Sequence, residues 1–247
     1  MYLFLVALQF LTRLPSPIRH DITPEDLGRA IGWFPVVGAA LGVLLAAGDR
    51  VASALLNPMV ANALIVAFLV AVTGALHLDG LIDTAEGLIV GPDGAARLAA
   101  MRQTVVGMPG VLAASLLLLA TFGAIDALDP HVRAQALVLA PLCGRTCILA
   151  GYWLYPYGRR EPSLSSFLKT GATGRRAAAG LSFAAAACVV VAAVGGIAVL
   201  VLALAAMHAI ATIALTRVPG LTGDVHGAIC EATQLIALLA APLALRS

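Results

Sequence analysis

Three carboxylates stand at helical spacing within one short segment of the chain. Asp79, Asp83 and Glu86 occupy positions i, i+4 and i+7, so a helix would place them along one stripe. Like charges at such spacing weaken a helix by about 0.2–0.5 kcal/mol per pair, and beside an apolar span they would be poorly solvated. A divalent cation removes both penalties, and oxygen ligands favour Mg²⁺ or Mn²⁺. The spacing therefore predicts a magnesium site with these three residues as ligands.

The neighbouring residues favour this interpretation over the simpler alternative, a solvated helix end with incidental acids. His77 lies in the same segment, and a histidine with three acids beside an apolar run forms an unusually dense polar group. Gly80 and Gly87 carry no side chains beside the stripe. We therefore expect room there for a bulky phosphate.

Arginines downstream could bind that phosphate. Arg97 and Arg102 follow in the same loop and are either phosphate clamps or ordinary basic residues of a cytoplasmic loop. Arg145 stands inside an apolar run, where a guanidinium is costly. It either reaches the cytoplasmic mouth of the protein or pairs with a buried acid such as Asp126.

A second acidic segment lies near the end of the chain. Asp224 stands in a glycine-rich turn, and Glu231 follows seven residues later, just inside the last apolar run. This arrangement repeats that of the first segment, so both residues are candidates for substrate binding.

The elements that must position these residues are membrane-spanning helices. Of the 247 residues, 61% are hydrophobic and only 11% charged, and the mean hydropathy is +0.98, whereas an ordinary globular domain is about 25% charged. A soluble protein, a disordered chain and a disulfide scaffold are thereby excluded. The net charge of +2, without a basic tract, argues against nucleic acid as a partner. We predict an all-α integral membrane protein in the lipid bilayer, with residues 1–247 forming one polytopic domain.

Seven apolar runs are long and do not alternate between apolar and polar residues. This is the pattern of membrane-spanning helices, which need about 20 residues to cross a bilayer. The weakest boundary is Gly195-Gly196, which predicts either a tight connection between the fifth and sixth runs or one broken helix. The predicted spans are Ile31–Ala47 (which Val51–Leu56 could extend), Met59–Leu76, Val111–Ala127, Ala134–Leu154, Ala177–Val194, Gly196–Leu215 and Gly227–Leu245.

The N-terminal segment differs from these runs because Tyr2 to Leu14 are too few residues to span a bilayer. Its polar residues fall on one helical face. We predict a helix that lies in the membrane interface or re-enters the bundle and that ends at the prolines 15 and 17.

The basic residues predict the orientation of the spans. With seven spans, one side receives Arg13, Arg19, Arg29, Arg97, Arg102, Arg159, Arg160, Lys169, Arg175, Arg176 and Arg217, and the other receives only Arg50, Arg133 and Arg246. Loops rich in lysine and arginine stay cytoplasmic, so the N-terminus is expected inside and the C-terminus outside. Most acidic residues fall on that cytoplasmic side too, which is typical of a surface that handles a charged, phosphate-bearing substrate.

Four stretches resemble the cobalamin synthase family, the adenosylcobinamide-GDP ribazoletransferases. They are Phe10-Leu-Thr-Arg-Leu-Pro15, Gly28-Arg-Ala-Ile-Gly-Trp-Phe-Pro-Val-Val-Gly38, Leu76-His-Leu-Asp-Gly-Leu-Ile-Asp-Thr-Ala-Glu-Gly87, and Thr222-Gly-Asp-Val-His-Gly-Ala228 followed by Glu231. The H-x-D-G-x-x-D-T segment is highly specific and the N-terminal stretches moderately so. The resemblance covers nearly the whole chain.

The resemblance implies a Mg²⁺-assisted transfer in the cell inner membrane. A ribose hydroxyl of α-ribazole, or of its 5′-phosphate, attacks the corrin-side phosphorus of adenosylcobinamide-GDP, and GMP leaves. Such chemistry needs charge neutralisation and positioned reactants. Asp79 and Asp83 are then catalytic with His77, which could accept the hydroxyl proton. The implied substrate-binding residues are Arg13, Arg29, Arg97, Arg102, Arg145, Asp224 and Glu231. A homo-oligomer is compatible with the sequence.

The chain departs from the family in one loop. The family reads M-[K/R]-D-S-R-x-G where this chain reads Met101-Arg-Gln-Thr-Val-Val-Gly107, so an aspartate and an arginine are absent. If these residues bind metal or pyrophosphate, the departure implies a slower enzyme, a shifted substrate or lost activity. The loop Pro156–Pro162 matches only loosely, and Arg159 within it is a further candidate for substrate contact.

Two other functions compete with this interpretation. A CDP-alcohol phosphotransferase performs similar chemistry in a bilayer, but its D-G-x-x-A-R…G-x-x-x-D-x-x-x-D pattern is absent after Asp79-Gly80. A transporter usually binds near the midplane in broken helices with repeat symmetry, whereas here the acids gather at one face and no repeat is evident.

Overall fold

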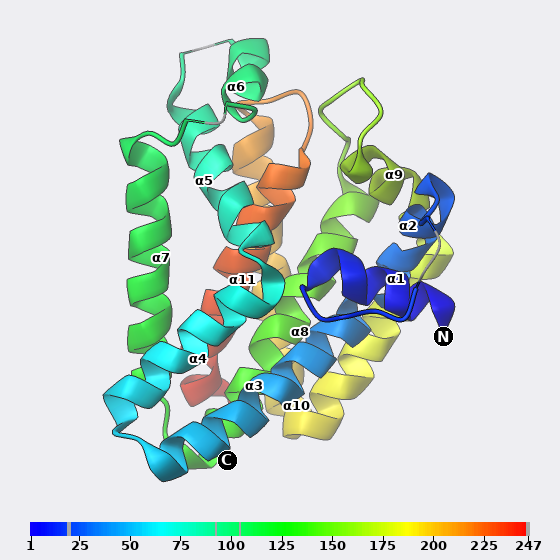
Figure 1. Ribbon diagram of the computed structural model, residues 1–247. Helices are drawn as coiled ribbons and strands as arrows, with labels where there is room; N and C mark the ends of the chain where they lie inside the picture. Colours follow the sequence, from blue (N-terminus) through cyan, green and yellow to red (C-terminus); the bar gives the residue numbers. More distant parts are fainter. Residues whose placement is uncertain (19–20, 92, 104, 246–247) are drawn as a thin grey trace.

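The computed structural model describes residues 1–18, 21–91, 93–103 and 105–245, which form helices joined by short connections (Figure 1). Arg19, Thr104 and Arg246, which enter the sequence predictions, lie outside the described residues. The helices are α1 Tyr2–Leu11, α2 Pro24–Ala30, the 3₁₀ turn η1 Ile31–Trp33, α3 Phe34–Leu55, α4 Pro58–Thr73, α5 Leu76–Ile89, α6 Gly94–Ala100, α7 Met108–Asp126, α8 Pro130–Leu154, α9 Leu164–Gly171, α10 Gly174–Leu215 and α11 Gly223–Ala244.

Five stretches of helix are long and apolar enough to cross a membrane, and α4 with α5 makes a sixth if the bent pair counts as one. Helix α8 is the centre of the bundle, because 83% of its most apolar window is buried, against 22% for α7 at the edge. The prediction of an all-α membrane protein is confirmed. The five stretches are Pro24–Leu55, Met108–Asp126, Pro130–Leu154, Gly174–Leu215 and Gly223–Ala244.

Helix α10 is two antiparallel limbs rather than one rod. Ala192 and Ala193 have non-helical backbone angles, and Ala193 has φ +46°. The Cys188 carbonyl oxygen lies 2.2 Å from the place a Cβ on Gly196 would occupy, although eight residues of continuous helix span about 12 Å. The chain therefore reverses here, as Figure 1 shows, three residues before the glycines that predicted the boundary. If both limbs are counted, and the bent α4–α5 pair is counted as one span, the described residues offer seven candidate spans, the number predicted.

The second predicted span, Met59–Leu76, is confirmed as helix α4 up to Thr73, where the helix ends three residues earlier than predicted. Gly74 and Ala75 both adopt left-handed backbone angles, with φ of +61° and +57°, and α5 leaves α4 at 88°. The Arg13 side chain lies where a Cβ on Gly74 would stand, and the Arg13 N–H donates to the Val72 carbonyl at 2.7 Å. The end of α1 is thus fastened to the break, and α5 becomes a separate arm that carries the acidic segment.

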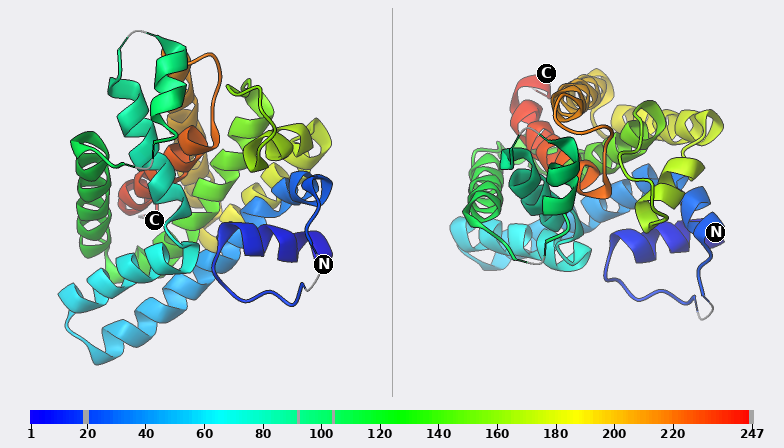
Figure 2. Two further views of the ribbon diagram at one scale, coloured as in Figure 1. Left: turned by 45° about the horizontal axis from the view of Figure 1, so that its top comes forward. Right: turned by 90° about the horizontal axis from the view of Figure 1, so that it is seen from above.

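Helix α1 lies crosswise to the bundle (Figures 1 and 2). It ends at Leu11, before the prolines at 15 and 17, and Thr12 is already extended. Val6, Ala7 and Leu11 are fully buried against α3 and its neighbours. The crosswise placement agrees with a helix in the interface or a re-entrant helix and does not separate the two.

A polar network joins four helices at the end of the bundle away from α5. Arg133 donates to both carboxylate oxygens of Asp49, at 2.8 and 2.7 Å, and to Asn62. The Asn62 amide donates to Asp126 at 2.8 Å. Asp126 therefore belongs to this network, and the alternative in which it pairs with Arg145 is wrong.

Lys169 of α9 caps the last turn of α8, whose C-terminal carbonyls have no partner within the helix. Its ammonium donates to the carbonyls of Tyr152 and Tyr155, both at 2.7 Å. Lys169→Met is expected to lower the unfolding free energy by about 1.5 kcal/mol and the melting temperature by about 3–6 °C in detergent. Arg175→Met, at an exposed position nearby, is the matched control, and equal melting temperatures for both variants would contradict the capping role.

Candidate active site

The site begins where α5 crosses the N-terminal turn of α11. A Cβ on Gly80 would lie 2.8 Å from the Asp224 carbonyl oxygen, and one on Gly227 would lie 3.0 Å from the His77 carbonyl oxygen. Only glycine lets the two backbones approach so closely. Gly80 thus serves helix packing, although it also lines the cavity described below. Gly87 packs against Met101, so the expectation of open space is wrong at Gly87.

This crossing brings acids from the two sequence segments together. Asp83 is half-buried and interacts electrostatically with Asp224 and Asp79. The Arg159 guanidinium donates to an Asp224 carboxylate oxygen at 2.8 Å, with both side chains largely buried. Three carboxylates and one paired guanidinium leave an excess of negative charge that a cation would neutralise.

Glu86 has a partner of its own in the structure. The Gly110 N–H, in the first turn of α7, donates to its carboxylate at 2.8 Å. Gly107 and Gly110 lack the Cβ atoms that would stand about 3 Å from that carboxylate. A carboxylate at a helix N-terminus satisfies an otherwise unpaired N–H and interacts favourably with the helix dipole. Glu86 therefore stabilises α7, a partner the sequence did not indicate.

The magnesium site stays a prediction. Among the described residues, no three His, Cys, Asp or Glu side chains lie close enough to hold an ion on their own. Mg²⁺ is usually held by one or two carboxylates, with waters and substrate phosphates completing its shell. The oxygen-only set of Asp79, Asp83 and Asp224, with its excess negative charge, fits that manner of binding.

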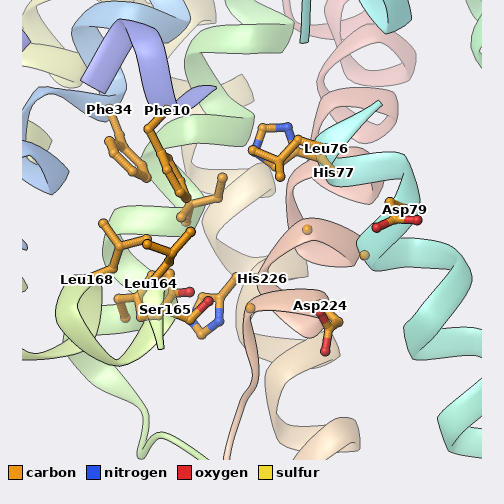
Figure 3. A pocket seen from close by; sticks show the side chains of 15 residues that line it. Phe10, Phe34, Leu76, His77, Asp79, Leu164, Ser165, Leu168, Asp224 and His226 are labelled. Atoms are coloured by element: carbon orange, nitrogen blue, oxygen red, sulfur yellow. The ribbon is translucent and has the colours of Figure 1, made fainter. Parts of the chain in front are cut away.

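A cavity of about 170 Å³ opens beside these carboxylates (Figure 3). Asp79 and Asp224 lie at one end of it, and the apolar side chains of Phe10, Phe34 and Leu168 lie at the other. Further lining residues are Leu76, His77, Gly80, Ile148, Tyr152, Leu164, Ser165, Gly223, His226 and Gly227. Sequence reasoning missed Ser165 and Tyr152, which no motif marks, and treated His226 only as part of the matching stretch.

The guanidinium of Arg145 is fully buried behind this cavity. It donates to the Gln234 amide oxygen and lies 3.5 Å from His77 Nδ1. Glu231 lies within electrostatic reach of the same guanidinium. Because arginine can only donate, a hydrogen bond to His77 leaves the histidine proton on Nε2. At Nε2, His77 would then donate a hydrogen bond rather than accept a proton. Its predicted role as a base stays a prediction.

The other predicted arginines are dispersed. Arg97 is buried and donates to the carbonyls of Val90 and Arg217 at 2.9 and 3.1 Å. Arg102 is half-exposed and pairs with Glu161 at 2.6 Å. Arg13 lies at the α4–α5 break, and Arg29 lies on exposed α2 beside Glu25. The structure thus brings Arg159 to the acids, while the other arginines predicted in exposed loops hold other partners.

The loop that departs from the expected pattern lies beside the C-terminal half of α5. Gln103, Val105 and Val106 line a second cavity of about 320 Å³ together with Asp83 and Glu86. The departure is therefore adjacent to the acidic stripe.

Comparison with known proteins gives a consistent match over the whole chain. The family model described as cobalamin-5-phosphate synthase matches residues 3–242. An adenosylcobinamide-GDP ribazoletransferase of Syntrophobacter fumaroxidans is 32% identical over 240 residues, covering 96% of this chain and 97% of its own. The enzymes of that name from Pseudomonas paraeruginosa and Stutzerimonas stutzeri are each 36% identical, over 242 and 239 residues, covering 97% and 95% of both chains. No solved structure matches the chain significantly.

Proposed function

The chain belongs to the cobalamin-5-phosphate synthase family, and from this premise we propose that it joins adenosylcobinamide-GDP to α-ribazole, or to its 5′-phosphate, with release of GMP. It is a multi-pass membrane transferase of cobalamin synthesis. The observation that carries the assignment is the α5–α11 crossing, which places Asp79 and Asp224 at the edge of an aromatic cavity, with Asp83 within electrostatic reach of both. Family membership decides against the CDP-alcohol phosphotransferase and the transporter.

One or two of Asp79, Asp83 and Asp224, together with oxygens of the substrate phosphates, would hold Mg²⁺. When bound there, the ion supplies positive charge to the phosphate oxygens on which negative charge develops. The aspartates keep that region anionic without it, so a pyrophosphate alone would be repelled. We therefore expect the corrinoid-GDP donor to bind productively only when Mg²⁺ is present.

The remaining task of the chain is to hold the attacking hydroxyl in line. Asp79 and Asp224 border the cavity, so a sugar placed there has carboxylate oxygens to accept its hydroxyl hydrogen. Arg159 holds Asp224 by its ion pair and keeps that carboxylate oriented. Because phosphoryl transfer depends mainly on positioning and charge, a dedicated base is not essential, which suits a donor role for His77.

The direct test is an assay of purified chain in proteoliposomes with the corrinoid-GDP donor, α-ribazole and Mg²⁺. The expected result is GMP release that depends on both substrates and yields the joined corrinoid by mass spectrometry. GMP release without α-ribazole, or no product with both substrates, would refute the proposed reaction.

We also propose that the carboxylate face and the N-terminus are cytoplasmic in a bacterial inner membrane, with the C-terminus outside. Support comes from the clustering of basic residues on α6, α9 and the loops that lie at the same end of the molecule as α5 (Figure 1).

Cysteine labelling tests this orientation. The native cysteines 143, 147, 188 and 230 are free and buried and can be replaced. In that background, exposed Arg160→Cys should react with a membrane-impermeant maleimide only in opened cells, and exposed His131→Cys should react in intact cells. The reverse pattern would overturn the orientation.

A further inference from the structure

The cavity beside the carboxylates has a lining that the transfer step itself does not use. Figure 3 shows Phe10, Phe34, Leu164 and Leu168 gathered at the end away from Asp79 and Asp224. Ile148 closes the cavity from α8 and is 3% exposed. A ligand that reaches the carboxylates from this cavity must therefore carry an apolar group on its far side.

The size of the cavity limits that group to one small ring system. An apolar cavity of about 150 Å³ holds benzene, whereas pockets for drug-sized ligands measure about 300–1,000 Å³. A cavity of about 170 Å³ that opens at its mouth therefore admits one or two fused rings. It is far too small for the corrin macrocycle of the donor.

The walls are suited to a planar aromatic ring. Phe10, Phe34, Tyr152 and His226 all line the cavity. Phe10 is stacked on Phe34 and Tyr152 on His226, with ring centroids 5.8 and 3.7 Å apart, so each ring already uses one face within its pair. The other face or the edge of such rings attracts further flat rings. The apolar end thus favours a ring whose outer edge carries no hydrogen-bonding group, because a polar edge would be buried there without partners.

Both substrates of the proposed reaction, the acceptor nucleoside and the corrinoid-GDP donor, carry an aromatic base. The two bases differ in their distance from the reacting atoms and in the polarity of their edges. The acceptor has one sugar between its base and the hydroxyl that reacts. The guanine of the donor is separated from the reacting phosphorus by a sugar and a further phosphate, and its edge is polar. Asp79 and Asp224 directly border the cavity, so an acceptor whose reacting hydroxyl is one sugar away from its base suits this cavity better than the more distant, polar-edged guanine.

We propose that this cavity binds the base of the acceptor nucleoside, a small fused aromatic ring with an apolar outer edge, and thereby selects which bases the enzyme attaches. The proposal rests on the proposed transfer reaction and extends it to the identity of the acceptor. Phe10, Phe34 and Ile148 are then the residues that determine specificity, and His77 and Ser165 contact the ring or the sugar from the side.

The assignment of the cavity to the acceptor base can be tested by steady-state kinetics in proteoliposomes, with the KM measured separately for α-ribazole and for the corrinoid-GDP donor. Ile148→Phe fills the cavity and should raise the KM for α-ribazole at least tenfold, while the KM for the corrinoid-GDP donor stays within twofold. Leu116→Phe adds the same bulk at an exposed position of α7 (64% exposed) and is the matched control. A rise in the donor KM alone would place the guanine in the cavity and overturn the proposal, as would two unchanged constants.

A second variant decides the question if Ile148→Phe does not fold. Phe10→Ala enlarges the cavity and should favour a nucleoside with a third fused ring, raising its kcat/KM relative to α-ribazole at least tenfold. An unchanged ratio would contradict the proposal. Wild-type protein that transfers no acceptor at all would instead refute the proposed reaction, so the two failures are distinguishable.

Discussion

Asp83→Asn is expected to lower turnover by about 100- to 1,000-fold while the protein stays folded in the membrane. Asparagine keeps the shape of the side chain and removes its charge. A bound metal ion stabilises the transition state of phosphoryl transfer by several kcal/mol. Each 1.36 kcal/mol of that stabilisation that is lost lowers the rate tenfold. Because Asp83 is half-buried near Asp79 and Asp224, the change also relieves like-charge repulsion and should not destabilise the fold. The measurement is GMP release against Mg²⁺ concentration, with melting temperature as the check on folding.

Glu86→Gln is the matched control, because Glu86 stands on the same helix one turn further on. Glutamine keeps an oxygen that can accept from the Gly110 N–H, so the stabilisation of α7 is largely retained and activity should fall less than about tenfold. An equal loss in both variants would make Glu86 a third metal ligand, as the sequence predicts. Full activity for Asp83→Asn, or undiminished wild-type activity in excess chelator, would refute the metal site itself.

The features that could be predicted from sequence are those that local spacing determines. The stripe Asp79, Asp83 and Glu86 lies on one helix because its spacing is helical and the segment has no proline. The reversal in α10 lies within three residues of Gly195, because Gly195-Gly196 is the only pair of adjacent glycines in the 42 residues of α10. The membrane class follows from composition, since a chain with so few charges has no other way to bury its surface.

The features that could not be predicted depend on contacts distant in sequence. The break at Gly74 is fixed by Arg13, about 60 residues away, and nothing in the local segment distinguishes it from a tolerated glycine. The partner of Glu86, the Gly110 N–H, could not be predicted because a backbone group does not show in the pattern of side chains, and the metal role of Glu86 stays a prediction. A weak signal existed for the α5–α11 crossing: Gly80 and Gly227 are glycines within apolar segments, and small residues are typical of places where helices approach closely.

Restoring the family residues by Gln103→Asp with Val105→Arg is expected to raise the rate about ten- to a hundredfold. Gln103 and Val105 line the cavity that Asp83 and Glu86 also border, and Val105 is 79% exposed. An arginine there has room and faces carboxylates and an incoming pyrophosphate. One charge-assisted contact is worth about 1.5–3 kcal/mol, and a factor of ten in rate is about 1.4 kcal/mol.

The opposite outcome has a definite physical meaning. If Arg97 and Arg102 already bind the pyrophosphate from a rearranged loop, a new arginine would crowd them and the rate would fall. The structure weighs against this, because Arg97 donates to two backbone carbonyls and Arg102 pairs with Glu161. The measurement is initial GMP release by wild type, both single variants and the double variant in matched proteoliposomes. No change in any of them would mean that the loop lies away from the substrate, and the assignment of Arg102 to the phosphate would fail with it.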